Sequence, residues 1–194
     1  AEFRARVALP AGGVGSMIDL VNRPVVRLLM VGLPALAVQT TLLAELTPFG
    51  IVMQLMLCMS IGAGVSAGPE GGALAGFVLG LMFDFALTSP LGLSALVYGL
   101  AGYAAGFVFS QSIANPRWLN AITCAGLSAV AVFVQPIVAN WIGVEGWISS
   151  RLVKVMVVVG VTNGIASYVV VPVMRWCLAV RRLQRMAPPA EVYL

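Results

Sequence analysis

The sequence predicts an all-α membrane protein with six transmembrane helices. Hydrophobic residues make up 60% of the 194 positions and charged residues only 9%, whereas soluble domains carry roughly 25% charged residues. The mean hydropathy is +1.00. Between Arg27 and Arg175 the chain consists of long, nearly uncharged runs. These runs do not alternate in polarity as the strands of a membrane barrel would, so we expect every spanning element to be a helix.

Four spans are delimited directly by charged residues. The uncharged runs 28–44, 46–69, 118–144 and 155–174 each have about the length that a helix needs to cross the hydrocarbon core. They predict the first, second, fifth and sixth helices, at residues 26–45, 50–68, 119–139 and 152–179.

The third and fourth spans require a different argument, because Asp84 separates a short run, 71–83, from a run, 85–116, that is too long for one helix. Both fit if Asp84 lies inside a span and the chain turns at Pro90. Proline disfavours helical geometry in the residue before it, so a break there is expected. The predicted third and fourth helices are residues 71–88 and 91–112.

A single membrane domain, residues 17–186, accounts for nearly the whole chain. Residues 1–16 are polar, rich in glycine and proline and without periodicity, so we expect a disordered or non-native extension. Residues 187–194 are expected to form a tail.

The distribution of basic residues predicts the orientation. With six spans, both ends of the chain lie on one side of the membrane. On that side fall Arg4, Arg6, Arg23, Arg27, Arg117, Arg175, Arg181, Arg182 and Arg185, against Arg151 and Lys154 on the other. Cytoplasmic flanks are enriched in lysine and arginine. We therefore expect cytoplasmic termini and an external loop at residues 140–151.

Apart from Glu45 at the end of the first predicted span, Asp84 is the one acidic residue inside a predicted span. A carboxylate in the membrane is costly unless it is paired, so we expect it to face the bundle interior. Arg151 and Lys154 lie on the same predicted side and are candidate ion-pair partners. Tyr98, Ser89 and the backbone amides of the turn between the third and fourth helices are alternatives. We expect a structural role.

Small residues line both helices around Asp84. Gly72, Gly76, Gly80 and Asp84 recur at every fourth position, and the next helix places Ala95, Gly99, Gly102 and Gly106 on roughly one face. Small residues let helix backbones approach closely in a membrane. The stripe indicates tight packing between the two helices, and a groove for a partner helix is the second interpretation.

The sequence lacks the motifs that are typical of several functional classes. The chain has no histidine, which excludes histidine metal sites and imidazole proton shuttles. It has no GxxxxGK[ST] loop, no GxSxG elbow, no CxxC pair and no metal-ligand cluster. Its basic residues have no interleaved aromatics, so we expect no binding of nucleic acid. We expect membrane lipid to surround the protein. We predict a protein without catalysis, metal or cofactor.

The segment GFVLGLMFDFALTSPLGLSALVYGLAGYAAG resembles the signature region of the rod shape-determining protein MreD family. The matching positions are Gly76, Gly80, Asp84, Pro90, Leu91, Gly92, Ala95, Gly102, Tyr103 and Gly106. The site residues implied as structural or partner-binding are Gly76, Gly80, Asp84, Pro90, Gly92, Tyr98, Gly102 and Gly106.

The resemblance implies a non-enzymatic scaffold subunit of the bacterial cell-elongation complex, in the cytoplasmic membrane. Such a subunit would bind the single-span protein MreC. It would act with RodA, a class B transpeptidase and the MreB filament to direct side-wall peptidoglycan synthesis. The implied fold is that of the substrate-binding subunits of energy-coupling-factor transporters.

An actual substrate-binding subunit of a vitamin transporter of that class is the alternative, because it has the same size and number of spans. A vitamin site would require converging polar and aromatic groups near the outer side, and aromatic residues make up only 8% of the chain.

Overall fold

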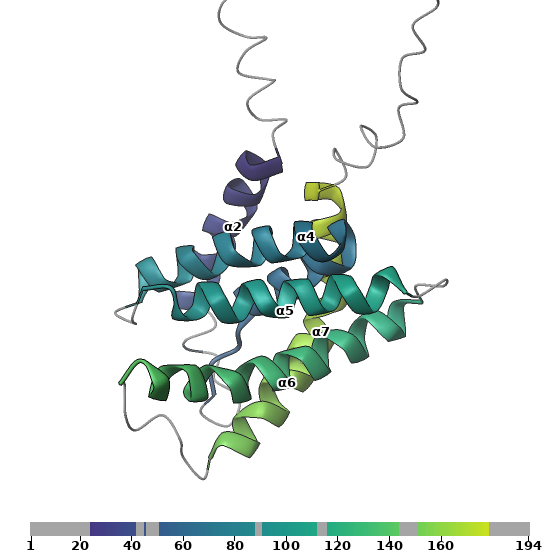
Figure 1. Ribbon diagram of the computed structural model, residues 1–194. Coiled ribbons are helices and arrows are strands. Elements are labelled where there is room, and N and C mark those ends of the chain that lie inside the picture. Colours follow the sequence, from purple (N-terminus) through teal and green to yellow (C-terminus); the bar gives the residue numbers. More distant parts are fainter. Residues whose placement is uncertain are drawn as a thin grey trace, which may run out of the picture.

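The computed structural model describes residues 24–41, 45, 51–87, 91–111, 116–143 and 151–178. The extension 1–16, the tail 187–194, Pro90 and most of the 140–151 loop lie outside these ranges. Within them the fold is entirely helical (Figure 1). The helices are α2 (Pro24–Thr40), α4 (Leu55–Ala86), α5 (Leu93–Ser110), α6 (Arg117–Trp141) and α7 (Leu152–Leu178).

The described residues thus form five helices rather than the predicted six, and the difference lies in α4. This helix contains one non-helical residue, Gly68, with φ 81° and ψ −175°. Such a positive φ is readily adopted only by glycine, and Pro69 follows with a φ suited to a helix start. We call residues 55–67 the first arm of α4 and residues 69–86 its second arm.

The two arms of α4 run back along each other. A β-carbon at Gly72 would overlap the backbone of Gly64, and one at Gly76 would overlap the side chain of Ser60. Residues equally distant from Gly68 therefore face each other, as in an antiparallel hairpin. The arms occupy the positions of the predicted second and third helices, with a one-residue reversal where the sequence indicated a short loop.

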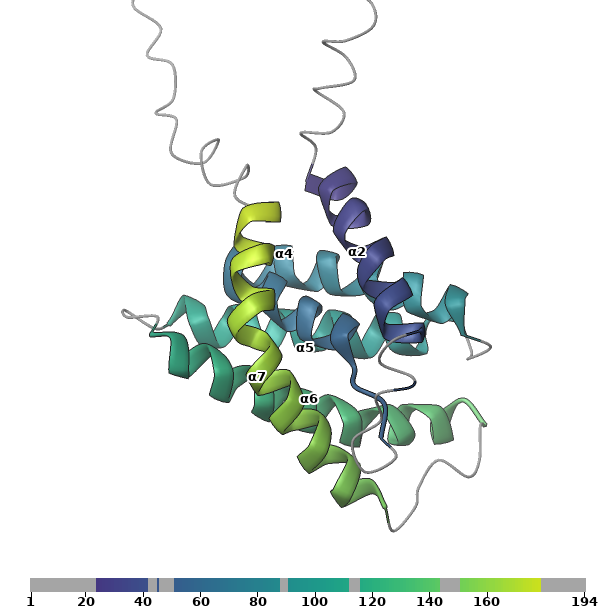
Figure 2. The ribbon, with the colours of Figure 1, turned by 180° about the vertical axis from the view of Figure 1, so that it is seen from behind.

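The second arm of α4 and α5 lie side by side along their lengths (Figures 1 and 2). The helix α6 packs against α5, and α7 packs against α6 and against the first arm of α4. The core between these helices is apolar and includes Met56, Leu57, Ile61, Leu79 and Met174, all 0% exposed. Close packing holds these helices together, because in lipid there is no hydrophobic driving force for association between helices.

The beginning of α2 and the end of α7 meet at one end of the bundle (Figure 2). There the guanidinium carbon of Arg27 lies 5.5 Å from the ring centroid of Trp176, within the range of a cation–π contact. The contact joins Arg27 to the residue next to Arg175, and the sequence predicts that Arg27 and Arg175 lie on the same side of the membrane.

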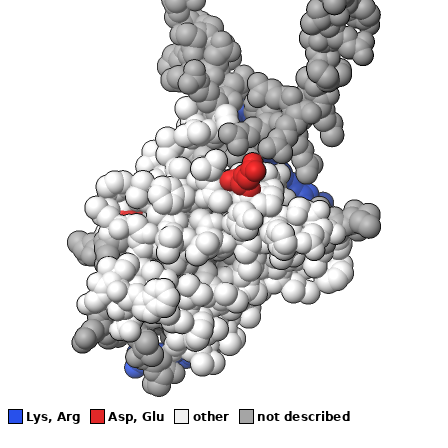
Figure 3. All heavy atoms as spheres, viewed as in Figure 1, with Lys and Arg blue, Asp and Glu red and all other residues white. Residues whose placement is uncertain are grey.

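Four helices, α4 to α7, are long and apolar enough to cross a membrane, and α2 is a shorter apolar helix of 17 residues. The protein is therefore a multi-pass membrane protein. Large hydrophobic side chains face outward on every helix, and the face in Figure 3 carries few charged atoms. This outward apolar surface is what a lipid environment requires.

The first arm of α4 begins within the protein rather than at its edge. Residues 51–54 are not helical, and the buried side chain of Gln39, on α2, accepts a 2.8 Å hydrogen bond from the backbone N–H of Met56. A helix start leaves N–H groups without partners. Gln39 satisfies one of them, which matters because irregular backbone at membrane depth must be satisfied by protein.

Candidate functional site

The carboxylate of Asp84, on the last turn of α4, binds the first turn of α5. Its Oδ2 accepts hydrogen bonds from the backbone N–H groups of Gly92 at 2.9 Å, Ser94 at 3.1 Å and Ala95 at 3.3 Å, and its Oδ1 lies 3.2 Å from the Ser94 nitrogen. Asp84 is only 1% exposed. It therefore acts as the N-terminal cap of α5, although it belongs to the preceding helix.

The backbone of α5 explains why a foreign cap is needed. Its own cap position is Gly92, which has φ 97° and no side chain to accept a hydrogen bond. The carboxylate supplies both a hydrogen-bond acceptor and a negative charge at the positive end of the helix dipole. Glycine suits this turn because other side chains rarely adopt a positive φ.

The partners of Asp84 described by these hydrogen bonds are the turn amides, one of the predicted alternatives. Arg151 and Lys154 lie exposed at the start of α7, and their pairing with Asp84 stays a prediction. Tyr98 is fully buried beside Asp84's helix, with its ring 5.8 Å from that of Phe83. Its hydroxyl has no hydrogen-bond partner among the described residues.

The predicted glycine stripe lies at a backbone-to-backbone contact between the second arm of α4 and α5. A β-carbon at Gly80 would overlap the backbone of Ala95, and one at Gly76 would overlap that of Tyr98. Further along, a β-carbon at Gly72 would overlap the backbone of Gly102, and one at Gly102 would overlap the backbone of Gly72. The antiparallel pair is thus in contact through main-chain atoms over its whole length.

The contact between α4 and α5 extends to the reversal at Gly68, where the two arms of α4 join. A β-carbon at Gly106 would overlap the backbone at Gly68 and Pro69. In the centre, the Ser60 hydroxyl of the first arm donates a 2.5 Å hydrogen bond to the carbonyl of Tyr98. Both arms of α4 and α5 therefore form one closely packed unit, with Asp84 at one end and Gly106 at the other.

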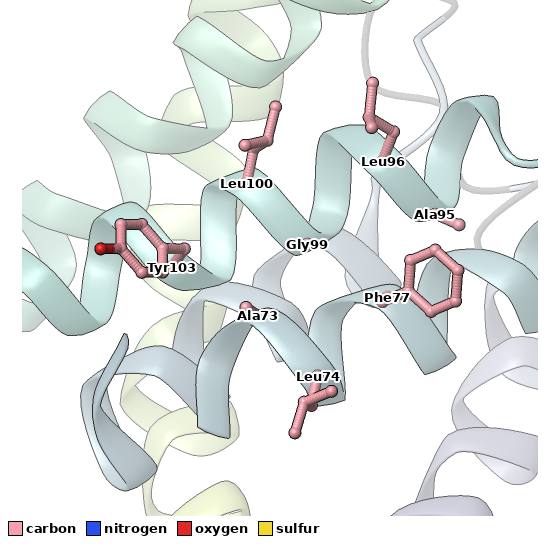
Figure 4. A pocket seen from close by; sticks show the side chains of 8 residues that line it. All are labelled: Ala73, Leu74, Phe77, Ala95, Leu96, Gly99, Leu100 and Tyr103. Atoms are coloured by element: carbon pink, nitrogen blue, oxygen red, sulfur yellow. The ribbon is translucent and has the colours of Figure 1, made fainter. Parts of the chain in front are cut away.

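A groove runs along the outer face of this unit (Figure 4). It has a volume of about 360 Å³ and a floor of small residues, Ala73, Ala95 and Gly99. The side chains of Leu74, Phe77, Leu96, Leu100 and Tyr103 border it. They are about half exposed or more, so the groove is an apolar surface available to a neighbour in the membrane.

Gly99 differs from the other glycines of the stripe. A β-carbon there would lie 3.4 Å from the carbonyl oxygen of Ala73, an ordinary contact. Packing within the chain therefore does not require glycine at this position, and its effect is to deepen the groove. The sequence pattern placed Gly99 with Gly102 and Gly106 on one face and did not separate their roles.

A set of polar contacts joins α6, α7 and the first arm of α4. The side-chain amide of Asn163 donates a 2.9 Å hydrogen bond to the Ser128 hydroxyl, and the Cys58 thiol lies 3.5 Å from the Asn163 carbonyl oxygen. All three side chains are buried. These pairs were not predicted from the sequence.

Among the described residues, no group of three or more histidine, cysteine, aspartate or glutamate side chains could hold a metal ion. The geometry around Asp84 is that of a structural cap, since every one of its described hydrogen bonds goes to a backbone donor.

No curated protein and no solved structure matches the chain. The family model of the rod shape-determining protein MreD matches residues 23–181. This range includes all five helices and the whole unit formed by α4 and α5. The chain therefore belongs to the rod shape-determining protein MreD family, and is a non-enzymatic, multi-span membrane protein with a role in determining rod shape.

Proposed function

We propose that this protein is a membrane scaffold subunit that binds MreC and helps to direct side-wall peptidoglycan synthesis. The outward groove on a rigid α4–α5 unit carries the proposal. Membership of the MreD family supports assembly with the elongation machinery, in which RodA, a class B transpeptidase and MreB would be further partners.

In the proposed membrane arrangement the chain crosses six times, with α2, each arm of α4, α5, α6 and α7 as the crossings. Both termini are cytoplasmic. The excess of arginine near the two ends of the chain supports this orientation. The contact between Arg27 and Trp176 supports a common side for the beginning of α2 and the end of α7.

We also propose that the fold is that of the substrate-binding subunits of energy-coupling-factor transporters. Its support is the count of helical segments once α4 is divided at Gly68. The first arm is about 20 Å long at 1.5 Å per residue. It therefore crosses only together with the non-helical residues 51–54, which precede it in the chain.

We propose that the single transmembrane helix of MreC docks in the groove between the second arm of α4 and α5. Two rows of apolar side chains border a floor of small residues, which is the shape into which a helix ridge packs. Asp84 acts indirectly in this proposal, because it holds the start of α5 against α4 and so fixes the distance between the two rows.

Copurification of full-length MreC with this protein tests the proposal. Gly99→Leu adds a side chain to the groove at a position where a β-carbon makes only ordinary contacts within the chain, and should greatly reduce the amount of MreC recovered. Gly126→Leu is the matched control, because Gly126 lies on α6 and a β-carbon there would meet nothing within 4 Å. Equal recovery of MreC with both variants would refute docking in this groove.

The alternative, a vitamin-binding subunit, is not favoured by any described cavity. The three described cavities are lined almost entirely by apolar side chains. The starts of α4 and α5 already bind the side chains of Gln39 and Asp84, respectively. A vitamin that copurifies with the protein in stoichiometric amount would reverse this preference.

A further inference from the structure

Two buried hydroxyl groups lie on one face of α5, beside Asp84. Ser94 and Tyr98 are four residues apart on this helix, and both side chains are 0% exposed. Neither the Ser94 Oγ atom nor the Tyr98 hydroxyl oxygen has a hydrogen-bond partner among the described residues. Buried polar side chains in proteins nearly always have a partner, because an unpaired hydroxyl in apolar surroundings is costly. The two hydroxyls therefore require a further group.

Both hydroxyls lie near the carboxylate of Asp84. The Ser94 nitrogen is 3.2 Å from Oδ1 and 3.1 Å from Oδ2, and the Oγ atom of a serine lies within about 4 Å of its own nitrogen. Tyr98 is one turn further along α5, and long side chains on a helix point back toward its N-terminus. In agreement with this direction, Asp84 is close enough for its charge to act on the Tyr98 hydroxyl. Three oxygen-bearing side chains thus converge at the start of α5.

The position of Tyr98 is fixed by its neighbours. Its ring packs against Phe83, with the ring centroids 5.8 Å apart, and its carbonyl accepts a 2.5 Å hydrogen bond from Ser60. A β-carbon at Gly76 would overlap the Tyr98 backbone, so this backbone lies directly against α4. No direct hydrogen bond joins the Tyr98 hydroxyl to the other two side chains. A link between them therefore requires a small bridging group.

Hydrogen-bond capacity decides which small group suits this place. A hydroxyl can donate and accept, and a carboxylate oxygen accepts more than one bond. A water molecule can accept a bond from Tyr98, donate one to Ser94 and donate another to Asp84, which makes the three bonds that a buried water typically has. A cation is disfavoured, because three backbone N–H groups already point their positive ends at this carboxylate.

We propose that one buried water molecule bridges the hydroxyls of Tyr98 and Ser94 to the carboxylate of Asp84. The water extends the cap of α5, because it ties the second turn of the helix to the same carboxylate that binds the first turn. Tyr98 thereby becomes a positioning residue for Asp84. The proposal does not depend on MreC, on the groove between α4 and α5 or on the orientation in the membrane.

Unfolding of the full chain in detergent, with and without the substitution Tyr98→Phe, tests the proposal. The substitution removes one hydroxyl and keeps the ring. If water binds this hydroxyl, a hydrogen bond is lost, and the equilibrium constant for unfolding should rise about fivefold, the equivalent of on the order of 1 kcal/mol. Removal of an unpartnered hydroxyl would have the opposite sign, because it relieves the cost of burial. A variant as stable as the parent, or more stable, would overturn the proposal.

The matched control is Tyr168→Phe. Tyr168 lies on α7 and is 53% exposed, so its substitution should leave the equilibrium constant for unfolding unchanged. An equal effect of the two substitutions would reduce the result to a general consequence of replacing tyrosine by phenylalanine, and it would also overturn the proposal.

A double-mutant cycle with Ser94→Ala tests whether the two hydroxyls share one ligand. Loss of either hydroxyl should release the water, so the combined variant should lose clearly less stability than the sum of the two single variants. The gain in helix propensity from alanine cancels in this comparison. Additive losses would mean that the two hydroxyls have separate partners, which contradicts a shared water.

Two further measurements distinguish water from other bridging groups. Ser89 lies between α4 and α5 in the chain, outside the described residues. Coupling of Tyr98→Phe to Ser89→Ala, and not to Ser94→Ala, would assign the bridge to that side chain. Unfolding of the parent in sodium chloride and in choline chloride at equal ionic strength should give the same result. Stabilisation by sodium that Tyr98→Phe removes would assign the site to a cation. Either of these two assignments would replace the water and refute its presence.

Discussion

The Oδ2 atom of Asp84 lies 2.9 Å from the backbone nitrogen of Gly92, across the turn that joins α4 to α5. The pair combines a buried carboxylate with a residue whose φ of 97° leaves its N–H directed at that carboxylate. Hydrogen bonds to charged acceptors contribute more than neutral ones. The relationship explains how an acidic residue is retained inside an apolar helix pair.

Replacement of Asp84 by alanine should destabilise the protein by about 2 kcal/mol, because the start of α5 loses both a cap and a compensating charge. Asp84→Asn keeps one acceptor oxygen and should cost less. Chemical unfolding in detergent, followed by circular dichroism, measures both. MreC recovery should fall in the same order. An alanine variant as stable as the parent would contradict the assigned role of the carboxylate.

The contact between the second arm of α4 and α5 predicts opposite effects for two glycine substitutions. Gly80→Ala should destabilise the protein by about 1–3 kcal/mol, since its methyl group would meet the backbone of Ala95. Gly126→Ala should be neutral or stabilise by up to about 1 kcal/mol, because alanine favours helix and space is open there. Thermal unfolding of the two variants in the same detergent makes the comparison. The interpretation fails if their effects have the same sign and size.

Much of the fold could be predicted because charged residues in an apolar chain mark the ends of helices. The helices that became α6 and α7 follow from uncharged runs alone, whereas the turn after Asp84 and the helix that became α5 also required Pro90 as a sign of a helix break. The reversal at Gly68 was harder to predict. The sequence indicated a helix end there, but a glycine and a proline do not reveal that the two arms join without a loop.

The candidate site was only partly accessible from the sequence, for two physical reasons. Opposite charges are visible in a sequence, so Arg151 and Lys154 came first as partners of Asp84, whereas the N–H groups of a helix start are visible only in three dimensions. Spacing by fours also drifts around a helix of 3.6 residues per turn. Gly99 therefore lies at the edge of the contact, although it shares the pattern of Gly102.

The hydrogen bond from Met56 to Gln39 gives a third prediction. Gln39→Leu keeps nearly the same side-chain volume but leaves a buried backbone N–H without a partner, which should cost about 1–3 kcal/mol. Amide hydrogen exchange at Met56 should become faster. Gln135→Leu on α6 is the control, because that half-buried side chain accepts no described backbone hydrogen bond. Unchanged exchange at Met56 in Gln39→Leu would exclude this capping role.

The orientation gives the last prediction. The test replaces Arg182, near the C-terminus, or Glu145, between α6 and α7 in the chain, by a single cysteine. Both positions lie outside the described residues. The native thiols Cys58, Cys124 and Cys177 are all 0% exposed, so they should react slowly with a membrane-impermeant maleimide and leave a clean background. In intact cells a cysteine at position 145 should be labelled once the outer membrane is made permeable, and one at position 182 only after the inner membrane is opened. The excess of arginine near the chain ends is the reason, since basic flanks are retained in the cytoplasm. Labelling of position 182 from the outside would reverse the orientation.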